Sequence, residues 1–341
     1  MAEPIRHGGD VREAARRYGI ELGDWLDLST GINPHAYPVP PVPVDAWRRL
    51  PEDADGLAEL AALHYGAPGA LPVAGSQAAI RALPGLLPIG VVGVAPLTYS
   101  EYAPAFERAG HRVEPLDISA DTLSAGVDHV IVGNPNNPTT ERIDREVLLR
   151  WHSQLTARGG TLIVDEAFAD AYDDAYDDAY DGVTANRSLA PESGRDGLVV
   201  LRSVGKFYGL AGIRAGFVLS AQPLRDALHD ALGQWTVSGP ARHAIQAAFN
   251  DYAWQAETRT VLKRESARLA ELVAKQGFDA HATPLFVWFE TQDAAALHHG
   301  LASKGIWTRL FEHGPKPSLR IGLTGSAEEW TRFAAAFETL T

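Results

Sequence analysis

Short apolar runs alternate with helix-compatible stretches along the first two-thirds of the chain. Strands that alternate with helical patterns are typical of parallel βαβ units. In such sheets, ligands bind beyond the carboxyl ends of the strands. We therefore expect functional residues at the ends of these runs. The runs are LPVAG (71–75), VVGVAP (91–96), HVIVGN (129–134), TLIVDEA (161–167) and LVVLRS (198–203).

The last third of the chain has a different pattern. Residues 241–277 have the periodicity of a long amphipathic helix. Two shorter strand candidates, PLFVWFE (284–290) and SLRIGL (318–323), lie on either side of a helical stretch at residues 294–305. This order predicts a smaller α+β domain at the end of the chain.

Two features near the N-terminus complete the predicted organisation. Residues 10–19 have helical spacing and end in glycine, which predicts a short helix. The proline-rich stretch from residue 34 to residue 43 predicts an extended arm. We expect three parts: a large domain over residues 36–235, an N-terminal arm over residues 1–35 and a small C-terminal domain over residues 236–341.

Composition and charge exclude several functions. The chain carries 30 lysines and arginines against 43 aspartates and glutamates, a formal charge of −13, which argues against a basic surface for nucleic acid. It contains no cysteine, so disulfides and thiolate chemistry are excluded. The charged N-terminus does not fit a signal peptide, and the uncharged segment 82–100 contains prolines that disfavour a membrane helix. We expect a cytoplasmic protein without membrane or nucleic-acid partners.

Two other sequence features carry no predicted chemistry. The twelve histidines show no ligand-like spacing beyond the adjacent His298 and His299, so we expect no metal site. Residues 170–182 read DAYDDAYDDAYDG, a repeat of Asp-Asp-Ala-Tyr. Because neighbouring aspartates repel each other in a helix, this segment predicts a solvated insertion.

The first three strand ends carry groups that suit one ligand. Gly75, Ser76 and Gln77 precede a helix, whose free backbone N–H groups suit a phosphate. Tyr99 follows the second strand and could stack on a flat heterocycle, although an aromatic side chain packed at a helix start fits equally well. Asn137, in the loop NPNNPTT, places an amide beyond the third strand.

The fourth and fifth strand ends add charged groups. Asp165 emerges from the buried run TLIV and needs a cationic or hydrogen-bonding partner there, although it could also only cap a helix. Ser203, Lys206 and Arg214 supply a hydroxyl, an amine and a guanidinium. An amine able to form an imine, an aspartate for a ring nitrogen, an amide, a stacking aromatic and a phosphate cup together indicate a pyridoxal 5'-phosphate site.

Several motifs also carry a family resemblance. NPNNPTT (134–140), DEAF (165–168) and SVGKFYGLAGIRAG (203–216) resemble the fold-type I pyridoxal-phosphate enzymes, the aspartate aminotransferase superfamily. HGGDVREAARRYG (7–19) and DLSTGINP (27–34) are similar to its cobalamin-biosynthetic, L-threonine-O-3-phosphate decarboxylase branch. The resemblance implies an α/β fold: a large domain with a mostly parallel sheet flanked by helices, plus a smaller α+β domain. It also implies a homodimer.

The resemblance assigns roles to individual residues. Lys206 would be the Schiff-base lysine, and Asp165 would pair with the pyridinium nitrogen. Asn137 would face the ring hydroxyl, and Tyr99 would stack on the ring. The residues that would hold the cofactor phosphate are Gly75, Ser76, Gln77, Ser203 and Arg214.

Substrate residues follow from the same resemblance. Arg320, in SLRIGL, matches the arginine that binds a substrate carboxylate in aminotransferase relatives. His7, Gly8 and Asn33 match positions near the phosphorylated substrate in the decarboxylase branch, and Asn137 also lies among the expected substrate residues.

Three positions depart from the family pattern. Phe168 stands where many relatives have a tyrosine that donates to the ring oxygen, and the decarboxylase branch shares this phenylalanine. Leu50 stands where relatives have a tyrosine that reaches the neighbouring subunit's cofactor phosphate. Thr140 replaces the glycine that usually follows Asn-Pro-Thr.

The resemblance implies a carboxy-lyase that decarboxylates L-threonine O-3-phosphate to (R)-1-amino-2-propanol O-phosphate in cobalamin biosynthesis. One alternative is an aminotransferase acting on a phosphorylated amine such as histidinol phosphate, because both reactions begin with the same activation of the substrate α-carbon. Another is a cofactor-binding component of a cobalamin-biosynthetic complex that has no catalytic role.

Overall fold

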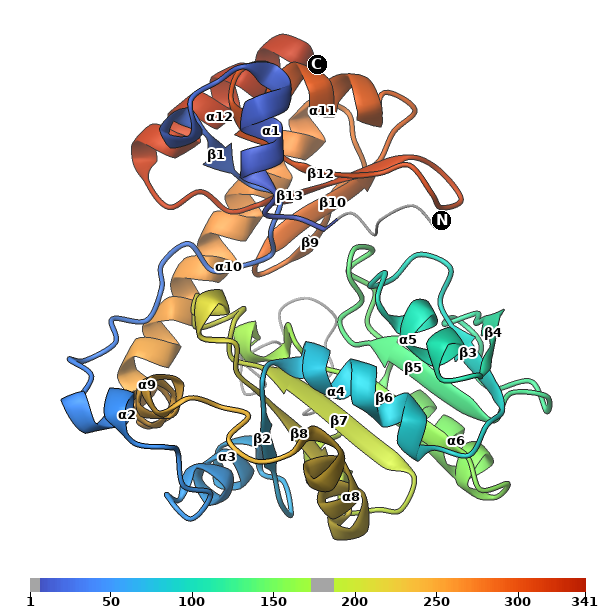
Figure 1. Ribbon diagram of the computed structural model, residues 1–341. Coiled ribbons are helices and arrows are strands. Elements are labelled where there is room, and N and C mark those ends of the chain that lie inside the picture. Colours follow the sequence, from blue (N-terminus) through green and yellow to red (C-terminus); the bar gives the residue numbers. More distant parts are fainter. Residues whose placement is uncertain (1–6, 173–186) are drawn as a thin grey trace. The chain divides into compact units, whose positions relative to one another are not determined.

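The computed structural model describes residues 7–172 and 187–341 (Figure 1). Contacts divide the chain into two compact units. We call residues 36–137 and 141–256 the sheet unit, and residues 1–35, 138–140 and 257–341 the terminal unit. The predicted insertion of Asp-Asp-Ala-Tyr repeats lies, from residue 173 onward, outside the described residues.

The sheet unit is built on a seven-stranded sheet in the order β2-β8-β7-β6-β5-β3-β4. The five strands from β7 to β4 are parallel, whereas β8 runs antiparallel to both β7 and β2. The predicted mostly parallel sheet is confirmed, and β4 and β8 are strands that the sequence did not predict. The bounds are β2 Leu71–Val73, β3 Val91–Val94, β4 Arg112–Pro115, β5 His129–Gly133, β6 Thr161–Asp165, β7 Leu198–Ser203 and β8 Gly216–Ser220.

Helices flank this sheet (Figure 1). Apolar side chains of α4, α5 and α8 form one core with the strands, including Ile80, Phe106 and Leu228. The central strands β5, β6 and β7 are buried throughout and mostly apolar, because both of their faces are covered. The helices are α2 Val44–Arg48, α3 Leu57–Tyr65, α4 Ser76–Ala82, α5 Tyr102–Arg108, α6 Arg145–Thr156, α8 Gln222–Leu232 and α9 Gly239–Asn250.

The second domain boundary lies later than the sequence predicted. The structure divides the chain between residues 256 and 257, inside α10 (Tyr252–Lys275), and not near residue 235. The reason is an aromatic cluster that holds α9 and the start of α10 on the sheet unit. Phe249 of α9 stacks on His64 with ring centroids 4.1 Å apart, and Trp254 of α10 stacks on Tyr208 at 5.8 Å.

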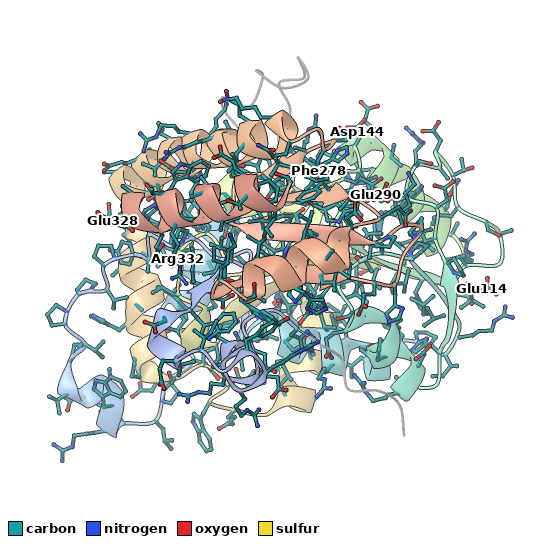
Figure 2. The ribbon with its side chains drawn as sticks, turned by 90° about the horizontal axis from the view of Figure 1, so that it is seen from above. Glu114, Asp144, Phe278, Glu290, Glu328 and Arg332 are labelled. Atoms are coloured by element: carbon teal, nitrogen blue, oxygen red, sulfur yellow. The ribbon has the colours of Figure 1, made fainter. Side chains whose placement is uncertain are left out.

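The terminal unit combines the two ends of the chain into one α+β structure. Its four-stranded antiparallel sheet has the order β12-β13-β10-β9, and β1 pairs with β11 in a separate parallel ladder. Arg332 of α12, labelled in Figure 2, donates from Nη2 to the carbonyls of Asp24, Lys304 and Gly305. The bounds are α1 Val11–Tyr18, β1 Leu26–Asp27, β9 His281–Thr283, β10 Phe286–Glu290, α11 Ala294–Ala302, β11 Ile306–Trp307, β12 Arg309–Phe311, β13 Ser318–Gly322 and α12 Ala327–Leu340.

In the part of the chain that the structure describes, no helix combines the length and apolar character needed to cross a membrane.

Candidate active site

Asp165 is a buried carboxylate at the carboxyl end of β6. Its side chain accepts two hydrogen bonds, from the Tyr102 hydroxyl to Oδ2 at 2.8 Å and from the Ala167 amide to Oδ1 at 3.0 Å. Burial raises the pKa of Asp165, while the Tyr102 and Ala167 hydrogen bonds and the charge of Lys206 act in the opposite direction. The structure therefore places a carboxylate with two fixed donors where the sequence expects a partner for a ring nitrogen.

Lys206 lies in the turn that follows β7. Its charge acts on Asp165, and its Nζ lies 5.6 Å from the centre of the Phe168 ring. The turn is tight, because a Cβ added at Gly205 would lie 3.0 Å from the Cα of Ala211. The amine and the carboxylate thus belong to one site at the ends of neighbouring strands.

Two glycines shape a cradle beside this site. Gly75 has φ +76°, and a Cβ there would lie 2.8 Å from Nη2 of Arg214. Gly216 pairs with Ser203, and a Cβ at Gly216 would lie 2.9 Å from the Ser76 amide nitrogen. The missing side chains leave room for the Arg214 guanidinium beside Gly75 and for the Ser76 amide beside Gly216. These donors fit a phosphate group.

Hydrogen bonds link Tyr99 and Glu101, in the segment before α5, through the side chain of Gln77. The Tyr99 hydroxyl donates to Gln77 Oε1 at 2.9 Å, and Gln77 Nε2 donates to Glu101 Oε2 at 2.9 Å. The pKa of Tyr99 is raised to about 12, mainly by burial and then by the charges of Asp165 and Glu101, with Arg214 acting against them. Gln77 therefore holds the Tyr99 ring within electrostatic reach of both Asp165 and Arg214.

Asn137 lies in the loop that follows β5, and β5 ends at Gly133 opposite Asp165. The preceding residue, Asn136, donates to the Leu97 carbonyl and accepts from the Thr98 hydroxyl. These bonds tie the loop to the segment before Tyr99. The loop thus lies at the predicted sheet edge, and the assignment of Asn137 to the ring hydroxyl stays a prediction.

The terminal unit brings together three of the predicted substrate residues. Arg320 of β13 is 6% exposed, and its Nη2 donates to the Ser29 carbonyl at 2.7 Å. Gly9 donates its amide to Ser29 Oγ at 2.7 Å, and a Cβ on Gly8 would overlap the Ser29 carbonyl. His7 and Gly8 are therefore held close to the peptide that Arg320 binds.

Asn33 has a different local role. Its side chain is 2% exposed, and its Oδ1 accepts a hydrogen bond from the His35 amide at 2.8 Å. This bond closes a turn after the segment that carries Ser29. The described contacts therefore assign Asn33 a turn-forming part, and its contact with substrate stays a prediction.

Sequence reasoning missed Arg309. This residue of β12 lies directly opposite Arg320 of β13 in the antiparallel ladder. Burial and the charge of Arg309 lower the pKa of Arg320 to about 9, opposed by Asp27. Two neighbouring guanidinium groups repel each other, and an anion bound to both would relieve that repulsion. The only sequence signal was a second arginine in the apolar stretch IWTRLF (306–311), which was not predicted as a strand.

Tyr102 was also missed. Within the segment TYSEY only Tyr99 was singled out, although Tyr102 lies three residues later, at the start of α5. Among the residues described, no group of three or more histidine, aspartate or glutamate side chains could hold a metal ion.

The chain is similar to proteins of stated activity. Residues 51–337 match the family model described as Aminotransferase class I and II. The chain is 47% identical to a threonine-phosphate decarboxylase from Pseudomonas aeruginosa over 97% of each chain, and 41% identical to one from a Sinorhizobium species over 98% of each. Its fold matches the crystal structure of histidinol-phosphate aminotransferase from Sinorhizobium meliloti in complex with pyridoxal-5'-phosphate. The TM-score is 0.80 at 19% identity, over 99% of this chain and 95% of that one.

Proposed function

The chain belongs to the aminotransferase class I and II family, and on this premise we propose that it decarboxylates L-threonine O-3-phosphate with pyridoxal 5'-phosphate as cofactor. The family and the fold predicted from the sequence are confirmed. The observation that carries the proposal is the sequence identity of 47% and 41% to two threonine-phosphate decarboxylases over nearly the full length of each chain. The product would be (R)-1-amino-2-propanol O-phosphate, for cobalamin biosynthesis.

The sheet unit contains the groups that would hold the cofactor. The amine of Lys206 would bind its aldehyde, Asp165 would accept a hydrogen bond from the protonated ring nitrogen, and the cradle at Gly75 would take its phosphate. When bound, pyridoxal phosphate supplies a ring that withdraws electrons from the substrate α-carbon. The remaining residues that would contact the cofactor are Ser76, Gln77, Tyr99, Asn137, Ser203 and Arg214.

The terminal unit contains the groups that would hold the anionic ends of the substrate. Arg320 and Arg309 would bind carboxylate or phosphate oxygens, and the backbone around His7 and Gly8 would support the same anion. We propose that these cations would bind the substrate in the orientation from which carbon dioxide leaves, and that Lys206, as general acid, would return a proton to the α-carbon.

The test is a direct assay of the loaded enzyme. Protein saturated with pyridoxal phosphate and given L-threonine O-3-phosphate should release carbon dioxide without any keto acid. The aminotransferase alternative, which the family membership also allows, predicts a different result. No carbon dioxide would be released, and glutamate would form when histidinol phosphate is the amino donor and 2-oxoglutarate is the acceptor. A cofactor-binding component without a catalytic role would form neither carbon dioxide nor glutamate. The Lys206→Ala variant of such a component would still bind its partner proteins.

We also propose that the enzyme acts as a homodimer in the cytoplasm. Several large apolar side chains are exposed on elements next to α9: Trp47 at 69%, Leu50 at 64%, Trp235 at 54% and Tyr252 at 63%. The helix that carries Trp47 packs against α9. A second copy of the chain would cover this apolar surface. Light scattering of the active enzyme should give the dimer mass, and a fully active monomer would contradict the proposal.

The cytoplasmic location follows from the proposed ligands. A phosphorylated cofactor and a phosphorylated substrate are charged metabolites that do not cross a membrane unaided. Fractionation of cells that express the protein should therefore recover the decarboxylase activity with cytoplasmic markers.

A further inference from the structure

We propose that Tyr102 is a positioning residue that keeps Asp165 ionised and oriented, so that the ring nitrogen of the cofactor stays protonated. The inference rests on the proposed role of Asp165 as the partner of that nitrogen. It concerns a tyrosine that would not touch the cofactor and would act only through the carboxylate.

The tertiary fold brings the two residues of the pair together. The Tyr102 hydroxyl donates to Asp165 Oδ2 at 2.8 Å across a separation of 63 residues. Tyr102 is 2% exposed and Asp165 is 6% exposed, so the hydrogen bond is shielded from bulk water. Such charge-assisted hydrogen bonds are about twice as strong as neutral ones.

The ring of Tyr102 is fixed by packing. It belongs to the same apolar core as Val94, Phe106 and Ile163, and the Tyr99 ring meets it edge-on with centroids 5.4 Å apart. Because Tyr102 is the first residue of α5, its backbone is fixed as well. The hydroxyl is thus held at one place relative to the end of β6.

The two donors leave the carboxylate ready for a third. An ionised carboxylate has about four lone-pair positions, two on each oxygen. Tyr102 occupies one on Oδ2 and the Ala167 amide occupies one on Oδ1. Each oxygen keeps one position, and the plane of the group is set by the two donors. A protonated ring nitrogen could bind at such a position.

Electrostatics explains why the hydroxyl matters. Burial favours the neutral acid, and a neutral Asp165 would not stabilise a positive ring nitrogen. The groups that act on Asp165 from the surrounding elements are Tyr102, the Ala167 amide, Lys206 and Tyr99, and the Tyr102 bond is the largest of those that favour the charged form. The pKa of Tyr102 itself is raised well above its usual value, mainly by burial, so the hydroxyl remains a donor.

The central experiment observes the ring nitrogen directly. Full-length protein loaded with pyridoxal phosphate carrying ¹⁵N in the ring is compared with Tyr102→Phe by ¹⁵N NMR. In wild type the signal should have the position of a protonated nitrogen, and in the variant it should move toward the unprotonated position. Cofactor affinity should fall about tenfold, the effect of losing one hydrogen bond to a charged group.

A matched control changes another buried tyrosine. Tyr65 also donates to a buried carboxylate, Asp170 Oδ2, at 3.5 Å. Tyr65→Phe removes the same atom from the same kind of environment but leaves Asp165 untouched. It should leave the ¹⁵N signal and the cofactor affinity at their wild-type values. An equal shift in both variants would mean a general structural effect and would overturn the inference.

Further measurements separate this inference from the proposed function. If wild type binds no pyridoxal phosphate, the proposed function fails, but ¹³C NMR of Asp165 in the same chain should still show its pKa raised by about one unit in Tyr102→Phe. If wild type binds the cofactor and neither signal changes in the variant, the inference alone fails. Should Tyr102→Phe not fold, 3-fluorotyrosine at position 102, a stronger donor, should lower the pKa of Asp165 in the ¹³C measurement, and an unchanged pKa would refute the inference.

Discussion

Acidification should destabilise the terminal unit through His298. This side chain lies on α11, is 5% exposed, and its Nδ1 is 2.9 Å from the Thr308 hydroxyl. The Trp307 ring packs on it with centroids 4.5 Å apart. Burial, followed by the neighbouring positive charges of His299, Arg17 and Arg309, lowers the pKa of His298 to about 4.

The size of the effect follows from proton linkage. In the unfolded chain the imidazole has its ordinary pKa of 6.5, so below that pH the unfolded state binds a proton that the folded state excludes. The contribution of the neutral His298 to the free energy of unfolding is complete above pH 6.5 and is lost as the pH falls toward about 4. One pKa unit corresponds to about 1.4 kcal/mol, so the full loss is about 3 kcal/mol, and about 2 kcal/mol of it is reached at about pH 5.

The assay is urea unfolding of wild type and His298→Gln at about pH 8 and about pH 5. Glutamine keeps a polar group near Thr308 but does not titrate, so the loss of unfolding free energy between the two pH values should be about 2 kcal/mol smaller in the variant. His313→Gln, which changes an exposed imidazole, is the control and should behave as wild type. If wild type and His298→Gln lost the same free energy on acidification, the reasoning would be wrong.

Three further predictions concern the site and its loops. Gly75→Ala should weaken cofactor binding at least tenfold, measured by absorbance titration, because a Cβ is strained at φ +76° and would displace the Arg214 guanidinium, whereas Gly85→Ala, with open space around it, should bind normally. Arg309→Met should lower kcat/KM for L-threonine O-3-phosphate about a hundredfold while cofactor affinity stays unchanged, and an unaltered kcat/KM would remove Arg309 from the substrate site. Thr140→Gly should raise the free energy of unfolding by about 1 kcal/mol, because a β-branched residue at φ +65° is strained; a destabilised variant in urea unfolding would contradict this.

Much of the candidate site could be predicted from the sequence because its residues lie at strand ends. Asp165 follows an apolar run, Lys206 follows the next, and parallel strands bring their carboxyl ends to the same edge of the sheet. The phosphate cradle was predicted from Gly75 and Arg214 on the same principle. Their approach also depends on Gly216, a position whose importance appears only when β8 is seen beside β7 and β2.

The residues that were missed depend on long-range packing. Tyr102 meets Asp165 because α5, which begins at Tyr102, packs on β3 and β4, and Arg309 lies opposite Arg320 because β12 pairs with β13 in one register. The late domain boundary has the same origin, since the aromatic side chains of α9 and α10 pack on α3 and on the turn after β7.

By itself the sequence determined the family, the alternation of strands and helices and the chemical groups at the strand ends, because these depend on local patterns and on the order of motifs. Only the tertiary structure decided which hydroxyl meets the buried aspartate, which arginines lie side by side and where the two units divide. Those outcomes depend on strand register and helix packing between residues far apart in the chain, which local pattern does not specify.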